Sequence, residues 1–109
     1  MFEFKIARDI GRFVSSRRSG SELRRKILSV LSSGEDCVIL DFADVVSVSG
    51  SFSDEVLGVL VKARGEAWVR QRVKLANVDD WTQRAIEGVI RERVDATPVS
   101  GDSHAPPCA

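Results

Sequence analysis

Asp54 and Glu55 are adjacent carboxylates and therefore candidates for acid–base chemistry. They precede apolar residues at helical spacing, which places them in the first turn of a predicted helix. Neighbouring residues of a helix point about 100° apart, so the two carboxylates would not converge on one substrate atom. The helix dipole favours acidic residues in a first turn, and we expect a structural role for this pair. Asp41 and Asp44 are likewise expected to be strand-end and turn residues.

Histidine and cysteine, the residue types that most often build catalytic or metal sites, are few in this sequence. Its one histidine, His104, lies in a proline-containing C-terminal stretch, and Cys37 and Cys108 have neither metal-site nor redox spacing. No nucleophile–base arrangement and no phosphate-binding glycine loop can be drawn. We therefore expect a protein that is not an enzyme, with no catalytic residue, no metal site and no cofactor. A structural disulfide is not expected either, which fits a reducing compartment.

Five basic residues lie close together in the N-terminal third of the chain: Arg17, Arg18, Arg24, Arg25 and Lys26. The favoured interpretation is a solvated helix surface. The alternatives are a nucleic-acid-associated module, an acidic protein partner or a nucleotide phosphate. Nucleic-acid binding is disfavoured because no interleaved aromatic residues or reading motif accompany the run. The formal net charge of +0, from 16 basic and 16 acidic residues, also argues against a non-specific nucleic-acid binder.

The elements that would position these residues alternate between strands and helices. Period-2 or continuous apolar patterns predict four strands, around residues 2–6, 13–14, 37–40 and 73–76. The third of these is continuously apolar, as in a strand covered on both faces. Helical periodicity predicts three main helices, the first beginning near Ser19 or Ser21 with a Ser19–Glu22 capping box. The second begins at Ser51 or Ser53, and Asp79 or Asp80 caps the third.

This order predicts one α/β domain over residues 1–94, with three main helices packed on a mixed sheet of about four strands. Residues 95–109 contain prolines, glycine and small polar residues and are expected to form a flexible C-terminal tail. No apolar run approaches the roughly 20 residues that span a bilayer, and no signal peptide is evident. We therefore expect a cytoplasmic protein without a membrane segment.

The second predicted helix has apolar residues around more than half of its circumference. Leu57 and Val61 lie away from the side that carries Phe52, Val56 and Leu60. They are either buried by a neighbouring helix or exposed to a partner, and Gly58 would allow close approach in both cases. Trp68 and Trp81 are expected to be core anchors.

Ser51 is expected to cap this helix. Its hydroxyl would accept a hydrogen bond from the backbone N–H of Ser53 or Asp54, worth roughly 1 kcal/mol.

Several short motifs occur in an order that is typical of a known family. They are Gly11-Arg12-Phe13, Ser16-Arg17, Ser19-Gly20, a strand ending in Asp41-Phe42, Ser51-Phe52-Ser53-Asp54-Glu55, Gly65, Trp68 and the strand from Val73 to Asn77. Over about residues 2–93 the chain resembles the STAS-like domain family of unknown function. That family is similar to the STAS domains of bacterial anti-sigma-factor antagonists.

The resemblance implies a regulatory, non-catalytic protein-interaction domain. In antagonist-type STAS domains an Asp-Ser-Ser-Gly stretch opens the central helix, and a partner kinase phosphorylates its second serine. That serine corresponds to Ser51 here, whereas the other three positions hold Ser49, Gly50 and Phe52. The implied partner is an ATPase that resembles histidine kinases, and a homodimer stays open. The predicted contact surface is Ser49, Gly50, Ser51, Phe52, Ser53, Asp54, Glu55, Leu57 and Val61.

A phosphate on Ser51 would add about −1.5 to −2 charges at pH 7. The positive end of the helix dipole would attract it, whereas Asp54 and Glu55 would repel it. We expect this conflict to shift the local structure or to weaken a docked partner.

Overall fold

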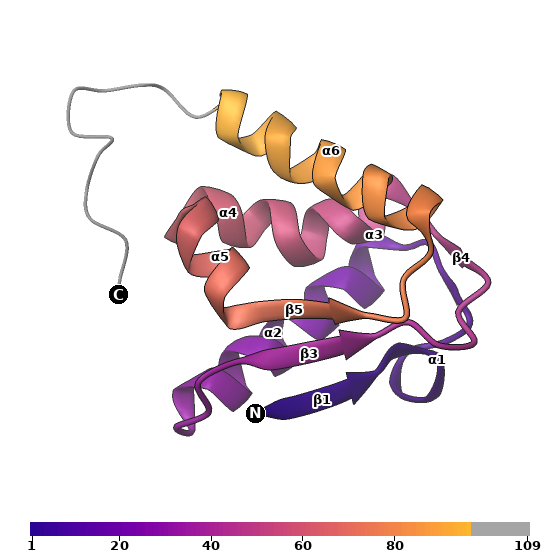
Figure 1. The fold of residues 1–109 in the computed structure, drawn as a ribbon, viewed down its shortest axis with the longest axis horizontal. Helices are drawn as coiled ribbons and strands as arrows, with labels where there is room; N and C mark the ends of the chain where they lie inside the picture. The colour runs from indigo at the N-terminus through magenta and orange to yellow at the C-terminus, as the bar shows by residue number, and fades with distance from the viewer. Residues whose placement is uncertain (97–109) are drawn as a thin grey trace.

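The computed structural model describes residues 1–96 and contains a three-stranded parallel sheet. Strands β1 (Phe2–Lys5), β3 (Val38–Asp41) and β5 (Val73–Ala76) pair in the order β1-β3-β5, with β3 in the middle (Figure 1). Helices lie between these strands in the sequence, and such long crossover connections let neighbouring strands run parallel. The sheet ends at Asp41, which is buried where β3 meets the following loop.

A second, two-stranded parallel sheet joins β2 (Phe13–Val14) to β4 (Ser47–Val48). The prediction of one mixed sheet of about four strands was therefore wrong, because the described strands form two sheets and every pairing in them is parallel. Phe13 and Val14 form a strand as expected, but they align with Ser47 and Val48 rather than with the main sheet. The N–H of Ser49 extends this pairing by donating to the carbonyl of Val14 over 2.9 Å. Pairing partners are set by three-dimensional proximity, which periodicity along the sequence does not record.

Besides the three main helical regions that were predicted, the described chain contains short helices. In chain order, the helices are α1 (Ile6–Asp9), α2 (Arg17–Ser32), α3 (Gly50–Ser53), η1 (Asp54–Gly58), α4 (Val59–Arg64), α5 (Glu66–Arg72) and α6 (Asp80–Ala96). The three segments α3, η1 and α4 follow one another without a break, and η1 is a single π-helical turn. Gly65, with φ at 95°, separates α4 from α5.

The starts of the long helices lie within a few residues of the predicted ones. The Oγ of Ser16 accepts a hydrogen bond from the N–H of Ser19 over 3.0 Å and caps α2. The predicted Ser19–Glu22 capping box is therefore wrong, because α2 begins at Arg17 and Ser19 is already inside it. Asp79 precedes α6 as expected, and its carboxylate accepts from the N–H of Thr82 over 2.6 Å.

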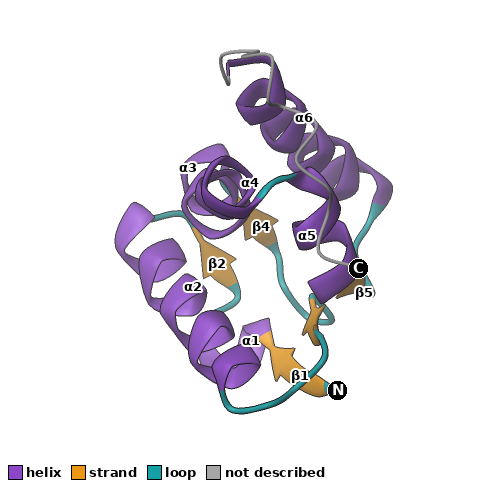
Figure 2. Ribbon diagram, turned by 90° about the vertical axis from the view of Figure 1, so that its left-hand side faces the viewer, coloured by secondary structure: helices purple, strands orange, loops and turns teal. Residues whose placement is uncertain are grey.

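All the long helices lie on one side of the main sheet (Figures 1 and 2). Phe4, Leu40 and Val73 face these helices and are buried, whereas Glu3 and Lys74 on the opposite face are exposed. The expectation that residues 37–40 would be covered on both faces was wrong. Successive residues of a strand alternate between its faces, and no described helix covers the second face.

Helix α6 forms an outer layer over α3, η1 and α4 (Figure 2). Its Ile86 and Ile90 are buried there, together with Leu57 and Val61. Trp81, at the start of α6, is 83% exposed, so its predicted role as a core anchor was wrong. The first turn of α6 carries it on the side that points away from Ile86 and Ile90.

Two further predictions concern the C-terminal tail and the absence of a membrane segment. Asp95 and Ala96 belong to α6, and the rest of the predicted tail, with His104 and Cys108, lies outside the described residues. None of the helices in residues 1–96 is long and apolar enough to cross a membrane.

Candidate functional site

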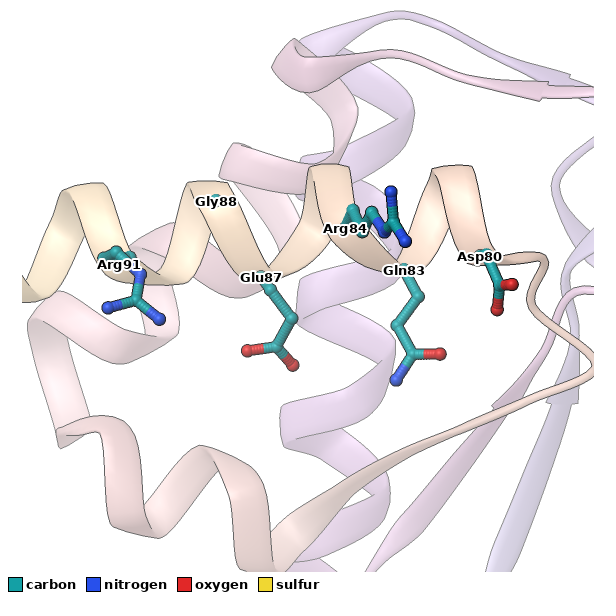
Figure 3. Close-up of a pocket in the computed structure, with 6 residues that line it drawn as sticks. All are labelled: Asp80, Gln83, Arg84, Glu87, Gly88 and Arg91. Atoms are coloured by element: carbon teal, nitrogen blue, oxygen red, sulfur yellow. The ribbon is translucent and has the colours of Figure 1, made fainter.

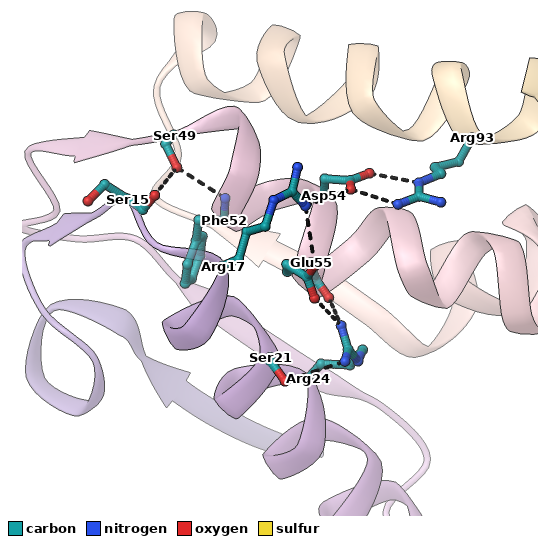
Figure 4. Close-up of polar contacts among 9 residues, drawn as sticks. All are labelled: Ser15, Arg17, Ser21, Arg24, Ser49, Phe52, Asp54, Glu55 and Arg93. Atoms are coloured by element: carbon teal, nitrogen blue, oxygen red, sulfur yellow. Dashed lines mark hydrogen bonds and ion pairs between the residues drawn. The ribbon is translucent and has the colours of Figure 1, made fainter.

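The candidate site is built where α2 and α6 meet the start of the α3–η1–α4 helix (Figure 4). Ser49, not Ser51, caps this helix. Its Oγ accepts from the N–H of Phe52 over 3.0 Å and donates to the backbone carbonyl of Ser15 over 2.8 Å. The helix therefore begins at Gly50, one residue before the expected start, and is fixed to the end of β2.

Because Ser49 caps the helix, the hydroxyl of Ser51 does not stabilise the helix start. It is half-buried in the first turn of α3, and its Oγ makes no hydrogen bond within residues 1–96. It borders an open groove of about 500 Å³ between α2, α3 and α6. The groove is lined by Arg17, Gly50, Ser51, Asp54, Val89, Glu92 and Arg93.

The carboxylate of Asp54 is held between two guanidinium groups. Arg93 of α6 binds it through two hydrogen bonds, with Nε 2.8 Å from Oδ1 and Nη2 2.7 Å from Oδ2. Arg17 of α2 approaches from the other side, with Nη1 3.3 Å from Oδ2 (Figure 4). These hydrogen bonds, above all those from Arg93, lower the pKa of Asp54 below its usual value. One carboxylate thus connects both outer helices to η1.

Glu55 makes a second set of contacts to α2. Arg24 donates from Nη1 to Oε2 over 2.9 Å and also to the backbone carbonyl of Glu55. Arg17 donates from Nη1 to Oε1 over 3.2 Å. The hydrogen bonds from Arg24 and Arg17 lower the pKa of Glu55. Both carboxylates are thus engaged in a structural role, but through ion pairs with arginines of α2 and α6 rather than through the first-turn position on which the expectation rested, because Gly50–Ser53 form the first turn.

Two glycines make this close arrangement sterically feasible. A Cβ on Gly20 would lie 2.7 Å from the Cβ of Glu55 and 2.8 Å from the carbonyl oxygen of Phe52. A Cβ on Gly58 would lie 2.3 Å from Oδ1 of Asp54 and 3.0 Å from Cγ of Arg93. Gly20 therefore allows α2 to approach α3, and Gly58 leaves space for the Asp54–Arg93 pair. The sequence-based expectation that Gly58 permits close approach agrees with this geometry.

Some residues of the predicted contact surface are buried, and the others are accessible. Phe52, Ser53, Leu57 and Val61 are buried, with at most 4% of each residue exposed. Leu57 and Val61 are covered by α6, which decides between the two interpretations of the apolar helix in favour of burial. The accessible part of the predicted surface consists of Ser49, Gly50, Ser51, Asp54 and Glu55.

The five basic residues do not form one surface. Arg17 and Arg24 pair with the acidic residues described above, and Arg18 lies 3.8 Å from Glu22 on the same helix. Arg25 and Lys26 are exposed. No observation on the described residues favours the nucleic-acid alternative.

Arg93 is a residue of the site that was not predicted from the sequence. It lies 39 residues from Asp54, and no local pattern links the two positions. Asp41, in contrast, behaves as the expected strand-end residue. It accepts from the side chain of Asn77 and from the N–H of Ala43, each over 2.9 Å, and these bonds lower its pKa. Within residues 1–96 no group of three potential ligands could hold a metal ion.

Comparison with known proteins gives one match. A family model described as a STAS-like domain of unknown function (DUF4325) covers residues 19–83. These residues include most of α2, the central strand β3, the α3–η1–α4 helix and β5. No curated protein and no solved structure matches the chain.

Proposed function

The chain belongs to the family of STAS-like domains of unknown function, and from this premise we propose that it is a regulatory protein-interaction domain. It acts in the cytoplasm, catalyses no reaction itself and binds a kinase-like ATPase through Ser49, Gly50, Ser51, Asp54 and Glu55. Phosphorylation of Ser51 controls this binding.

The observation that carries the proposal is the position of Ser51 in the groove. Its hydroxyl has no hydrogen-bond partner in the described part of the chain, so phosphorylation would break none. The groove is open and two guanidinium groups, of Arg17 and Arg93, line it. Arginine is well suited to bind a phosphate because its planar group donates several hydrogen bonds in fixed directions.

The modification would add one phosphoryl group and remove one proton. The γ-phosphoryl group of ATP is transferred to Oγ of Ser51, the hydroxyl proton passes to a base of the kinase, and ADP leaves. The product carries about −1.5 to −2 charges at pH 7. Asp54 and Glu55 repel it less than the sequence alone suggests, because each is already paired with arginine.

The phosphate would instead compete with Asp54 for Arg17 and Arg93. Both arginines are bonded to this carboxylate in the unmodified chain. If either turns to the phosphate, Asp54 loses a contact that connects η1 to α2 or α6. The accessible surface then changes in charge and in shape, and a partner that fits one form is released by the other.

The test compares two serines at the same end of the molecule. Tagged wild-type, Ser51→Ala, Ser51→Asp and Ser47→Asp chains are used to capture proteins from a lysate of the source cell with ATP present. Ser47 is exposed on β4 and does not line the groove, so its substitution is the matched control. Mass spectrometry identifies the bound proteins and any phosphate on Ser51.

We expect phosphate on Ser51 of the wild type and a kinase-like ATPase whose recovery changes at least about tenfold in Ser51→Asp. Ser47→Asp should recover the same amount as the wild type. Equal recovery by Ser51→Asp and the wild type, without phosphate on Ser51, would refute the switch.

A further inference from the structure

The outward side of α6 carries a row of alternating charges. Asp80, Arg84, Glu87 and Arg91 follow one another at intervals of four, three and four residues. At 3.6 residues per turn, these positions fall within about 60° of the helix circumference. They line a shallow hollow of about 520 Å³, together with Gln83 and Gly88 (Figure 3). All six residues belong to α6, so this is an open helix face.

Three of these four charged side chains are unpaired within residues 1–96. No hydrogen bond or ion pair joins Asp80, Arg84 or Arg91 to another residue in the described range, although Arg91 acts on Glu87 at longer distance. Glu87 alone is held directly, because Nη2 of Arg70 lies 2.7 Å from its Oε1. An ordered row of such charges along a rigid helix can be matched by another charged surface.

Apolar and small residues lie beside this row. Trp81 is 83% exposed, and Ala85 is exposed one turn further along. A Cβ on Gly88 would meet no atom within 4 Å. Glycine in an exposed helix interior is unfavourable compared with alanine, and nothing in the described chain requires it here. A surface that approaches this face closely would account for both Gly88 and Trp81.

We propose that this face of α6 binds the same face of a second copy of the chain, with the two helices antiparallel. A two-fold axis near Ala85 then places Asp80 opposite Arg91 of the second copy and Arg84 opposite Glu87 of the second copy. The row reads acidic, basic, acidic, basic, so every opposed pair is of opposite sign. Two-fold interfaces need this self-complementarity, because one surface meets its own copy.

The same axis brings Trp81 beside Gly88 of the second copy, displaced from it by two residues, or about 3 Å, along the helix axis. In an antiparallel pair related by a two-fold axis, each flank of one helix faces the same flank of the other. The charged row therefore meets the charged row, and the Trp81–Gly88 flank meets its own copy. The indole packs into the space left by the missing Cβ. A parallel arrangement would instead oppose Asp80 to Asp80 and Arg91 to Arg91, which is repulsive.

This interface is separate from the Ser51 groove. The groove lies on another side of α6, where Val89, Glu92 and Arg93 contribute to it. The dimer can therefore fail without any consequence for the proposed switch. A single pair of helices buries little area, so the dimer should form only as the concentration rises.

The test measures weight-average mass by sedimentation equilibrium over a range of concentrations. For the wild type, we expect the mass to rise from that of one chain toward that of two. Asp80→Arg and Arg91→Asp should each weaken association about tenfold, because each puts like charges opposite one another twice per dimer. Arg25→Asp makes the same charge change as Arg91→Asp on exposed α2 and should leave association unchanged.

An equimolar mixture of Asp80→Arg and Arg91→Asp provides the sharpest test. In a mixed antiparallel dimer, position 80 of one chain and position 91 of the other are both substituted, and they lie opposite each other with opposite charges. The unsubstituted Arg91 and Asp80 of the two chains form the second pair. Association of the mixture should return to the wild-type level. A second readout uses Trp68→Phe, in which Trp81 is the only tryptophan, and its emission should shift to the blue as the dimer forms.

Three results would overturn the proposal. The weight-average mass of the wild type could stay that of one chain at every concentration, which would mean that this face does not bind a second copy. The single variants could associate as strongly as the wild type, which would place the contact elsewhere. The mixture could associate no better than the separate variants, which would exclude the antiparallel pairing.

Discussion

The two sides of α6 use charge differently. On the inner side, Arg93 binds Asp54 through two hydrogen bonds of 2.8 and 2.7 Å. On the outer side, Asp80, Arg84 and Arg91 make no hydrogen bond or ion pair within residues 1–96. A charge that is paired inside the chain holds helices together, whereas an unpaired charge in an ordered row is available to a second molecule. The comparison separates the residues that maintain this fold from those that can recognise something outside it.

The glycines follow the same division. Gly20 and Gly58 are crowded, because a Cβ on either would lie less than 3.0 Å from a neighbouring atom. Gly88 faces open space. Substitution by alanine should therefore lower the stability of the fold at a crowded glycine and raise it at Gly88, and this contrast can be measured directly.

Gly20→Ala should give the largest effect of the substitutions considered. The added Cβ would push against the carbonyl oxygen of Phe52, which is backbone and cannot rotate away. We expect a loss of about 1–3 kcal/mol in the free energy of unfolding, measured by chemical denaturation. Unchanged stability would mean that α2 and α3 can separate without cost, and that Gly20 does not determine their approach.

Acid should weaken the contacts that Asp54 and Glu55 make with arginines of α2 and α6. The folded-state pKa values of Asp54 and Glu55 are lowered, so their contribution to stability is complete above the ordinary values near pH 4. It is lost as the pH falls through the lowered folded-state values. Asp54→Asn/Glu55→Gln should be about 1–2 kcal/mol less stable than the wild type at pH 7.

The difference in unfolding free energy between this double variant and the wild type should shrink between about pH 5 and pH 2. Denaturation at several pH values measures it. A difference that stays constant over this range would show that the ionised carboxylates do not stabilise the contacts with Arg17, Arg24 and Arg93.

Ser49→Ala and Ser51→Ala distinguish the serine that caps the helix from the serine that faces the groove. Ser49→Ala removes hydrogen bonds to Phe52 and Ser15 and should cost about 1 kcal/mol. Ser51→Ala removes none within the described chain and should change stability by less than about 0.5 kcal/mol. Thermal unfolding of both variants measures the difference. The reverse order of stability would restore Ser51 as the cap.

Gly88→Ala should give a smaller effect than Gly20→Ala, with the opposite sign. Alanine has the higher helix propensity and would meet no atom of the chain, so stability should rise by about 0.5–1 kcal/mol. The measurement belongs at low concentration, where the chain is monomeric. A loss of stability there would show that the outer side of α6 is more crowded than its geometry indicates.

Local sequence patterns predicted the elements of this fold well. Alternation and helical spacing placed the strands of the main sheet and the three long helical regions, and the ordered motifs pointed to the family that the match over residues 19–83 confirms. Each of these features depends on residues that are close in the chain. The helix starts were shifted by a few residues because several serines compete as caps, and only the backbone geometry selects among them.

The sequence by itself therefore determined an α/β chain, its family and a serine at the start of the central helix. The tertiary structure decided that β2 pairs with β4, that Arg93 binds Asp54, and that Trp81 points outward. These features join residues far apart in the chain or depend on how a helix rotates as it docks. Periodicity shows which side of a helix is apolar, but the neighbouring elements determine which side is buried and which charges meet.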